Sequence, residues 1–293
     1  MASFIELYER GRFLGTFDLP AYLHGEHGAN FRLLYAVRGG GNGIVFAAEP
    51  QGPLRNEIEL CAVKLLRQQD DTRLDRFENE IRIIRLLSHA RIAQFFDSGT
   101  IQVEDGYRVP WMAMELGERN LRQHVERNGP LNPDTIRSVG KQMCDALEQL
   151  HQKQIIHRDV KPDNFVWDGE DESSVIMIDF GIAKLVGEDV SGRPMDQFTQ
   201  QEEFVGPVFF ASPELIAYAS DKTQAVDMRS DLFQLGKVLW FLATGKISAG
   251  IPSGRDCPFK GALHDIVIQL LQDYPDDRPS TCHDVRNLLD ALI

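Results

Sequence analysis

The segment HRDVKPDN at residues 157–164 gathers an unusual set of side chains directly after the apolar pair Ile155–Ile156. It holds a histidine, two acids, two bases and an amide. One interpretation is a solvated charged loop. The other is a catalytic loop, in which Asp159 accepts a proton from a hydroxyl, Lys161 neutralises a transferring phosphoryl group and Asn164 offers its carbonyl oxygen to a hard cation. The segment alone leaves both interpretations open.

Three other segments carry side chains that suit the same chemistry. The apolar run VIMIDFG at 175–181 leads into Asp179, which is well placed to hold Mg²⁺, although an acid in a turn is more often a cap or a solvated group. The glycines of RGGGNG at 38–43 let backbone N–H groups approach a phosphate, although such a segment alone is more often a simple turn. Lys64 lies in a predicted apolar strand, where it either reaches solvent or pairs with Glu80 of the following segment.

Hydrophobic patterns predict the elements that must position these residues. Residues 1–30 show no regular pattern and are predicted to be irregular. Apolar runs bounded by turn residues predict strands at 31–37, 44–49, 59–66, 92–103 and 108–116. Helical spacing of apolar residues predicts helices at 71–89, 134–152, 227–244, 261–272 and 281–292. Residues 185–206 lack periodicity and are predicted to form a long loop. A strand-rich first part and a helix-rich second part indicate two lobes, joined near 115–120.

Composition excludes several classes of protein. The 293 residues are 43% hydrophobic and 26% charged, as in an ordinary globular enzyme. A formal net charge of −13 argues against general nucleic-acid binding. The four cysteines are far apart and contain no C-x-x-C pair, so neither a zinc site nor a disulfide framework is predicted. No signal peptide or apolar run of membrane-spanning length is recognisable. We therefore expect a cytoplasmic protein that binds neither membranes nor nucleic acid.

Taken in order, these motifs resemble those of the eukaryotic-like (Hanks-type) protein serine/threonine kinase family. The similarity runs from about Leu33 to Leu292, and its motifs are AVK (62–64), HRDVKPDN (157–164), DFG (179–181) and SPE (212–214). It implies an α+β, bilobal protein kinase fold. A small lobe of antiparallel β-sheet with one main helix would occupy residues 31–116, and a large, mostly helical lobe residues 117–293. Residues 1–30 would form an N-terminal extension that packs on the small lobe, gates the helix of Glu80 or makes a dimer contact.

The resemblance also implies roles for single residues, with ATP and Mg²⁺ as cofactors. Lys64, positioned by Glu80, would hold the α- and β-phosphates. Asp159 would orient and deprotonate the acceptor hydroxyl, and Lys161 would stabilise the transferring phosphoryl group. The implied Mg²⁺ ligands are Asn164 and Asp179. The other implied nucleotide contacts are Gly40 and Gly43 in the glycine-rich loop, Val45, Ala62 and Val166 around the adenine, the gatekeeper Met114, and the segment from Glu115 to Gly117.

Two further implied contacts are structural. Asp231 in DMRSDLFQLG would brace the backbone of the catalytic loop. Arg278 in DYPDDRPS would pair with Glu214 of the SPE motif. Breaking such a buried pair on one side would leave an uncompensated charge.

The sequence departs from the family pattern at two positions. Arg38 replaces the first glycine of the glycine-rich loop, where it either contacts phosphate or points to solvent. Pro207 follows Gly206 where the family usually has a threonine that touches the catalytic residues. These departures keep open a pseudokinase-like scaffold that binds nucleotide. A small-molecule kinase is a further alternative, although those enzymes lack the SPE segment.

Regulation and partners are also implied by the resemblance. Arg158 would belong to a pocket for a phosphate on the activation loop, with Thr199 as the acceptor, unless Glu202 and Glu203 already supply the negative charge. The implied partners are protein substrates, and Asp163 suggests a mild preference for basic peptides. We expect autophosphorylation, and a monomer or a transient dimer.

Overall fold

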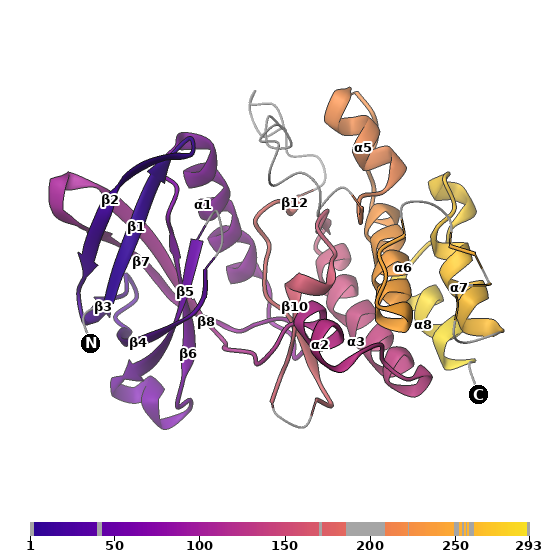
Figure 1. Cartoon of the computed structure of the whole chain (residues 1–293), viewed down its shortest axis with the longest axis horizontal. Helices are drawn as coiled ribbons and strands as arrows, with labels where there is room; N and C mark the ends of the chain where they lie inside the picture. Colours follow the sequence, from indigo (N-terminus) through magenta and orange to yellow (C-terminus); the bar gives the residue numbers. More distant parts are fainter. Residues whose placement is uncertain are drawn as a thin grey trace. The chain divides into compact units, whose positions relative to one another are not determined.

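The computed structural model describes residues 3–39, 43–169, 172–185, 209–221, 223–248, 252–253, 255, 257 and 261–291. The predictions made for Gly40, Thr199, Glu202, Glu203, Gly206 and Pro207, and for the side chain of Arg38, fall outside this part of the chain. The chain divides into two compact units. Unit 1 contains Met1–Ser88 and Ala93–Gly117, and unit 2 contains His89–Ile92 and Glu118–Ile293. Figure 1 draws unit 1 in indigo to purple and unit 2 from magenta to yellow.

Unit 1 is built on a six-stranded antiparallel sheet with the order β3-β4-β5-β6-β8-β7 (Figure 1). The strands are β3 (Tyr22–His24), β4 (Asn30–Gly39), β5 (Gly43–Gln51), β6 (Cys61–Leu66), β7 (Phe95–Gln102) and β8 (Arg108–Met114). Two short 3₁₀ helices, η1 (Gly52–Asn56) and η2 (Glu104–Gly106), lie between them. Sequence patterning located all of these strands except β3.

One α-helix, α1 (Asp71–Leu86), belongs to the described part of unit 1. Its N-cap is Asp70, whose side chain accepts a hydrogen bond from the Arg73 backbone N–H and so satisfies one of the free donors at the helix start. Four of its sixteen residues are buried, and they fall on one face: Phe77, Glu80, Ile83 and Ile84. The helix is therefore held to the unit by a narrow stripe.

The prediction that residues 1–30 are irregular was wrong. They form the hairpin β1 (Ser3–Glu9) and β2 (Arg12–Leu19), followed by β3. Alternate residues of this hairpin enter the hydrophobic core of unit 1, among them Ile5 and Leu7, which are fully buried. Exposed apolar residues on the other face, such as Phe4 and Phe13, interrupt the alternation and hide the strands from a pattern search.

Unit 2 is mainly helical. Its described α-helices are α2 (Leu121–Asn128), α3 (Pro133–Gln152), α5 (Pro213–Ser220), α6 (Arg229–Thr244), α7 (Ala262–Leu270) and α8 (Cys282–Asp290). Two short antiparallel pairs join β9 (Ile155–Ile156) to β12 (Lys184–Leu185) and β10 (Phe165–Trp167) to β11 (Val175–Met177). The 3₁₀ turns are η3 (Pro162–Asn164) and η5 (Pro275–Asp277). Helices α2 and α5 were not predicted.

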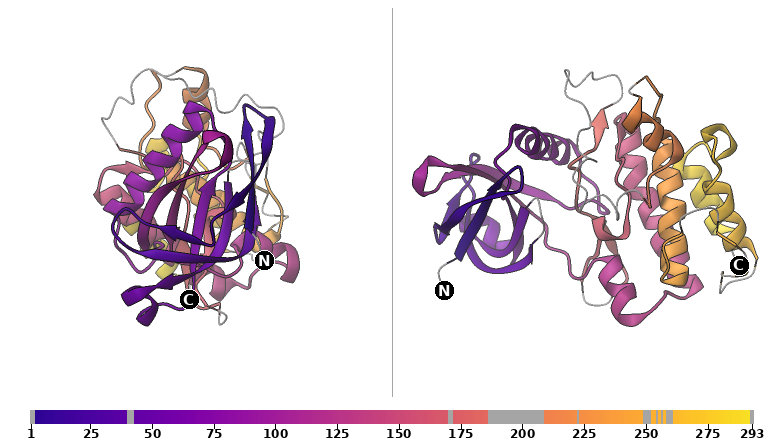
Figure 2. Two further views of the ribbon diagram at one scale, coloured as in Figure 1. Left: turned by 90° about the vertical axis from the view of Figure 1, so that its left-hand side faces the viewer. Right: turned by 45° about the horizontal axis from the view of Figure 1, so that its top comes forward.

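Helix α6 forms the centre of this unit. It contacts both α3 and α7, and α8 packs against α3; Figure 2 shows α3 and α6 running side by side. The side chains from Ser230 to Ala243 are all buried, so the helix is enclosed on every face. Across the described residues, no helix is long and apolar enough to cross a membrane.

Candidate active site

Unit 1 contains a buried ion pair formed by two of the predicted site residues. Lys64 lies in β6, between β5 and β8, and its Nζ is 2.6 Å from Oε1 of Glu80 on α1. The Glu80 side chain is 3% exposed and that of Lys64 is 17% exposed. A carboxylate this deeply buried requires a cationic partner, because an unpaired buried charge is costly. Lys64 therefore pairs with Glu80 rather than reaching to solvent alone.

The other residues predicted to contact nucleotide in unit 1 lie on neighbouring strands. Val45 pairs with Lys64 across β5 and β6, and Ala62 pairs with Met114 across β6 and β8. A Cβ added to Gly43 would lie 2.9 Å from a backbone carbonyl oxygen, so no larger residue fits there. The Glu115 backbone N–H donates to the carbonyl of Gln94, which fixes the strand end that leads to Gly117.

The catalytic-loop side chains of unit 2 meet between β9 and β10. Lys161 Nζ lies 2.6 Å from Asp159 Oδ2. The Asn164 Nδ2 donates to the same oxygen at 3.0 Å and to the Asp159 carbonyl at 2.8 Å. Both contacts hold Oδ2, and among the described residues no hydrogen bond to Asp159 Oδ1 is found. Oδ1 is therefore the oxygen available to accept a proton.

The charge of Lys161 is set by the acids around it. Burial alone would lower the pKa of Lys161, but the charges of Asp159 and Asp179 and the hydrogen bond to Asp159 outweigh burial and raise it. The lysine therefore remains a cation throughout the neutral range. A permanent positive charge beside Asp159 suits the stabilisation of a transferring anionic group.

Asn164 and Asp179 lie at the same end of a hairpin. Asn164 immediately precedes β10 and Asp179 follows β11, its antiparallel partner. The Ile178 backbone N–H donates to the Asn164 carbonyl at 3.0 Å, and the Gly181 N–H donates to Asp179 Oδ1 at 3.0 Å. Because Nδ2 of Asn164 faces Asp159, its Oδ1 points away from that contact. Two hard oxygen donors thus share one end of the hairpin.

This donor set fits Mg²⁺ in a particular way. Within the described residues, no group of three or more His, Cys, Asp or Glu side chains could hold a metal ion by itself. Mg²⁺ is usually bound by one or two carboxylates together with substrate phosphates rather than by a complete protein cage. One carboxylate and one amide oxygen are what such a shared site needs from the protein.

Asp231 of α6 holds the backbone of the catalytic loop. Its Oδ2 accepts hydrogen bonds from the His157 N–H at 2.9 Å and from His151 Nε2 at 2.8 Å, and its Oδ1 accepts from the Arg158 N–H at 2.8 Å. Burial opposes ionisation of this fully buried carboxylate, but these hydrogen bonds outweigh it and hold the pKa of Asp231 below its ordinary value. The loop is thus anchored to the central helix by a charged acceptor.

Glu214 and Arg278 form a bidentate ion pair at 2.7 and 2.9 Å. The Arg278 side chain is fully buried and also stacks on the Phe233 ring, 4.9 Å from its centroid. Its remaining N–H groups donate to the carbonyls of Arg229, Gln272 and Asp273. This pair joins the start of α5 to the segment before α8.

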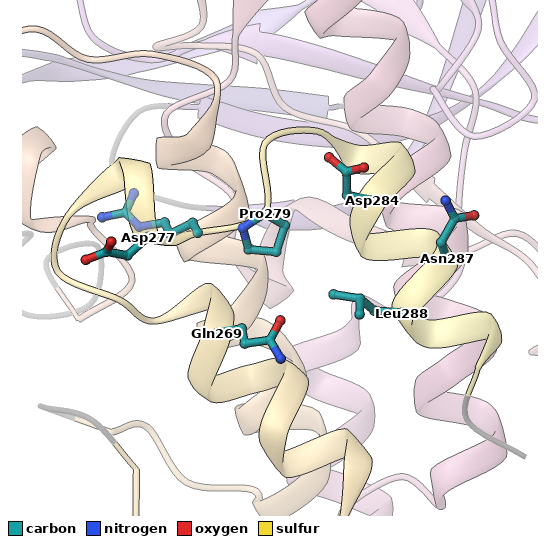
Figure 3. A pocket seen from close by; sticks show the side chains of 7 residues that line it. Gln269, Asp277, Pro279, Asp284, Asn287 and Leu288 are labelled. Atoms are coloured by element: carbon teal, nitrogen blue, oxygen red, sulfur yellow. The ribbon is translucent and has the colours of Figure 1, made fainter.

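A cavity of about 510 Å³ lies beside this pair (Figure 3). Gln269 of α7, Pro279 and Asp277 of the connecting segment, and Asn287 and Leu288 of α8 line it, as Figure 3 shows. None of the predicted catalytic or metal-binding residues lines this cavity. It is therefore not the candidate active site.

Comparison with known proteins decides the family. The family model described as the protein kinase domain matches residues 39–288. The chain belongs to the protein kinase family. The α+β kinase fold predicted from the sequence is thereby confirmed, with an antiparallel sheet in unit 1 and a helical unit 2.

Several bacterial kinases are among the relatives of this chain. It is 34% identical over 220 residues to the probable serine/threonine-protein kinase PknB of Corynebacterium glutamicum, covering 74% of this chain and 31% of the relative. It is 30% identical over 246 residues to the serine/threonine-protein kinase PknB of Mycobacterium tuberculosis, covering 77% and 37%. The corresponding protein of Mycobacterium leprae is 29% identical over 270 residues, covering 84% and 41%. The chain therefore spans about a third of the length of the curated relatives it matches.

Two residues that support the kinase catalytic loop were missed by sequence reasoning. Gln234 accepts from the Val160 N–H at 3.0 Å and donates to the Arg158 carbonyl at 3.0 Å. It lies one helical turn after Asp231, which is the signal that could have identified it. His151, at the end of α3, is hydrogen-bonded to Asp231, and the spacing of residues gave no sign of this contact.

Two residues predicted to contact phosphate or substrate are engaged within unit 2. The Arg158 guanidinium lies over the Tyr218 ring of α5, 5.2 Å from its centroid, and burial lowers the pKa of Arg158. Asp163 accepts a hydrogen bond from Arg122 Nε at 2.7 Å. The negative charge of Asp163 is therefore paired with a positive charge inside the chain.

Val166, predicted to contact adenine, is a buried residue of β10.

Proposed function

We propose that this chain is an ATP-dependent protein serine/threonine kinase that transfers the γ-phosphoryl group of Mg-ATP to Ser and Thr hydroxyls of protein substrates, including its own. The observation that carries this proposal is the arrangement around Asp159. One carboxylate oxygen is held by Lys161 and Asn164, and no residue that the structure describes donates a hydrogen bond to the other. Membership of the protein kinase family and similarity to bacterial serine/threonine kinases support the same activity.

The chain's own groups would act as follows. Asp159 Oδ1 takes the proton of the acceptor hydroxyl as its oxygen bonds to the γ-phosphorus, and the bond from phosphorus to the bridging oxygen breaks. Lys161 stabilises the negative charge of the transferring group, because its raised pKa keeps it protonated. Lys64, fixed by Glu80, orients the nucleotide phosphates.

Asn164 and Asp179 would hold Mg²⁺, which neutralises phosphate charge when bound. Val45, Ala62, Met114 and the backbone up to Gly117 would contact the adenine from unit 1. Val166 would contact it from unit 2. These assignments follow family membership, residue by residue.

The two alternatives suggested by the sequence gain no support. A scaffold without activity is not favoured when Lys64 and Glu80 form their pair and Asp159 is held for proton transfer. Small-molecule kinases lack the segment that contains Glu214, which Arg278 anchors here. A preference for basic peptides is not part of this proposal, because Asp163 already pairs with Arg122 within the chain. A cytoplasmic location is proposed because the phosphoryl donor of the proposed reaction is ATP.

The proposal is tested with the purified chain, Mg-ATP and a generic protein substrate. Asp159→Asn should lower phosphoryl transfer by about 10²-fold or more, because the proton acceptor is lost. Asp168→Asn is the matched control, because it makes the same change at an exposed carboxylate directly after β10. Thermal melting checks that both variants fold, and phosphoamino-acid analysis separates Ser and Thr from Tyr acceptors. Wild-type transfer by Asp159→Asn would disprove the assigned base.

A further inference from the structure

The N-terminal hairpin is attached to the segment that leads into α1. The Tyr8 N–H donates to the Arg67 carbonyl at 3.0 Å, and the Gln69 N–H donates to the Tyr8 carbonyl at 2.8 Å. Arg67 and Gln69 lie between the end of β6 and Asp70, the N-cap of α1. Strand β1 therefore adds a short parallel bridge to the segment from which the helix starts.

Side chains reinforce this attachment. Arg67 Nε donates to the Glu6 carbonyl at 3.1 Å, and its other end forms an ion pair with the Glu6 carboxylate. The Tyr8 hydroxyl donates to the same carboxylate at 2.9 Å, and the Arg67 guanidinium lies 4.9 Å from the Tyr8 ring centroid. The Arg67 side chain is only 16% exposed. Its partner Glu6 is 42% exposed, but the guanidinium also contacts a backbone carbonyl and the Tyr8 ring, so Arg67 is held by more than an isolated surface ion pair.

A second N-terminal residue contacts the other end of α1. His27 Nδ1 lies 2.8 Å from Oδ1 of Asp97, a fully buried carboxylate of β7. Burial opposes ionisation of Asp97, but hydrogen bonds from His27, Ser98 and Ala29 outweigh it and lower its pKa. Because the ionised carboxylate only accepts, the proton lies on Nδ1. In this tautomer Nε2 accepts from Arg85 in the last turn of α1, at 3.1 Å.

We infer that residues 3–30 are a positioning element for α1 and, through it, for the pair of Glu80 with Lys64. This inference rests on the proposed kinase function. Residues of the N-terminal segment hold both the entry to the helix and its last turn, while four buried side chains hold its face within unit 1. Because these four residues lie on one face, contacts at the two ends of the helix add to those that keep Glu80 in place. Arg67 is the key positioning residue.

The test uses Arg67→Ala, with Arg32→Ala as its matched control. Arg32 also pairs with a glutamate in unit 1, Glu49, but on β4 and β5 of the sheet. The rate of hydrogen exchange in the peptide covering 71–86 should rise about tenfold in Arg67→Ala and remain unchanged in Arg32→Ala. The kcat should fall about tenfold in Arg67→Ala alone, with little change in the KM for protein substrate. Equal exchange and equal kcat in the two variants would overturn the inference.

A double-mutant cycle separates positioning from a general loss of stability. If Arg67 acts through Glu80, then Arg67→Ala should have almost no further effect on kcat in a Glu80→Gln background. Additive losses would instead refute the coupling. The exchanged-charge variant, Glu6→Arg with Arg67→Glu, should recover part of the protection of α1. An inactive wild type would refute the proposed function. Hydrogen exchange requires no catalysis, so the protection of α1 would still test the positioning role.

Discussion

Replacing Asp231 with asparagine tests how the catalytic loop is held. The side chain keeps its shape but loses its charge and exchanges one acceptor oxygen for an NH₂ group. In the native arrangement the two carboxylate oxygens accept from His157, Arg158 and His151. Asparagine can accept on one side only, so its NH₂ must face a backbone N–H or the histidine. In either orientation, a buried N–H group of the asparagine then faces another buried donor, and neither has an acceptor.

The expected loss is about 3 kcal/mol in the free energy of unfolding. A hydrogen bond to a charged group contributes about 1.5–3 kcal/mol, against about 0.5–1.5 for a neutral one, and a buried donor without a partner costs about 1–3 kcal/mol. Removing the buried charge recovers part of its desolvation cost, which keeps the net loss below the sum of these effects. The loop backbone should shift as well, so phosphoryl transfer should fall together with stability.

The pH dependence follows from the lowered pKa of Asp231. Because the folded pKa lies below the ordinary value of 3.8, the carboxylate contributes its full stabilisation above that value. That stabilisation is lost as the pH falls through the folded pKa. Ionisation of this carboxylate should therefore make the same contribution to the free energy of unfolding between about pH 5 and 8. The advantage of wild type over Asp231→Asn that comes from it should shrink only in more acidic solution.

Urea unfolding followed by tryptophan fluorescence measures this difference. Trp167 and Trp240 report on unit 2, and Trp111 reports on unit 1. The control is Asp265→Asn, which removes an exposed carboxylate of α7 in the same unit and should cost less than about 1 kcal/mol. If Asp231→Asn is as stable as the control at pH 7, the anchoring of the loop by this carboxylate is refuted.

Three further predictions concern other parts of the chain. Arg278→Ala should lower the free energy of unfolding by about 3–5 kcal/mol, because Glu214 is left without its buried partner, while calorimetry should find nucleotide affinity little changed. Burial raises the pKa of Cys61 to about 12, so iodoacetamide at pH 7.5 should label this thiol only after unfolding; mass spectrometry of native and denatured samples checks this. Gly236→Ala should cost about 1–3 kcal/mol in thermal unfolding, since its Cβ would lie 2.7 Å from a side-chain carbon of α7.

The helices and strands that carry the site could be predicted because their patterns are local. Strand β6 places five fully or nearly buried residues around Lys64, and the spacing of Phe77 and Ile84 marks one face of α1. The order of the kinase motifs then predicted roles for their residues, and these roles remain predictions. Helix α2 escaped prediction because only Leu121, His124 and Val125 are buried in it, which is too short a stripe for a periodic signal.

Contacts between distant segments could not be predicted from patterns. Asp163 suggested a substrate contact, but its partner is Arg122, which lies 41 residues earlier in the chain. Arg67 gave no signal at all, because its partner Glu6 is 61 residues away in a segment that showed no regular pattern. A residue's type indicates what it can bind. Only the fold determines which partner reaches it.

The catalytic loop owes its shape to the central helix more than to its own sequence. The backbone N–H groups of His157, Arg158 and Val160 all donate to side chains of α6, either Asp231 or Gln234. Because that helix is buried on every face, these two acceptors cannot move without disturbing the core of unit 2. The loop can therefore hold Arg158 at a positive φ of 66°, a conformation unfavourable for an isolated arginine. The position of Asp159 is thus fixed by buried groups outside the loop, as the proposed role of Asp159 as a base requires.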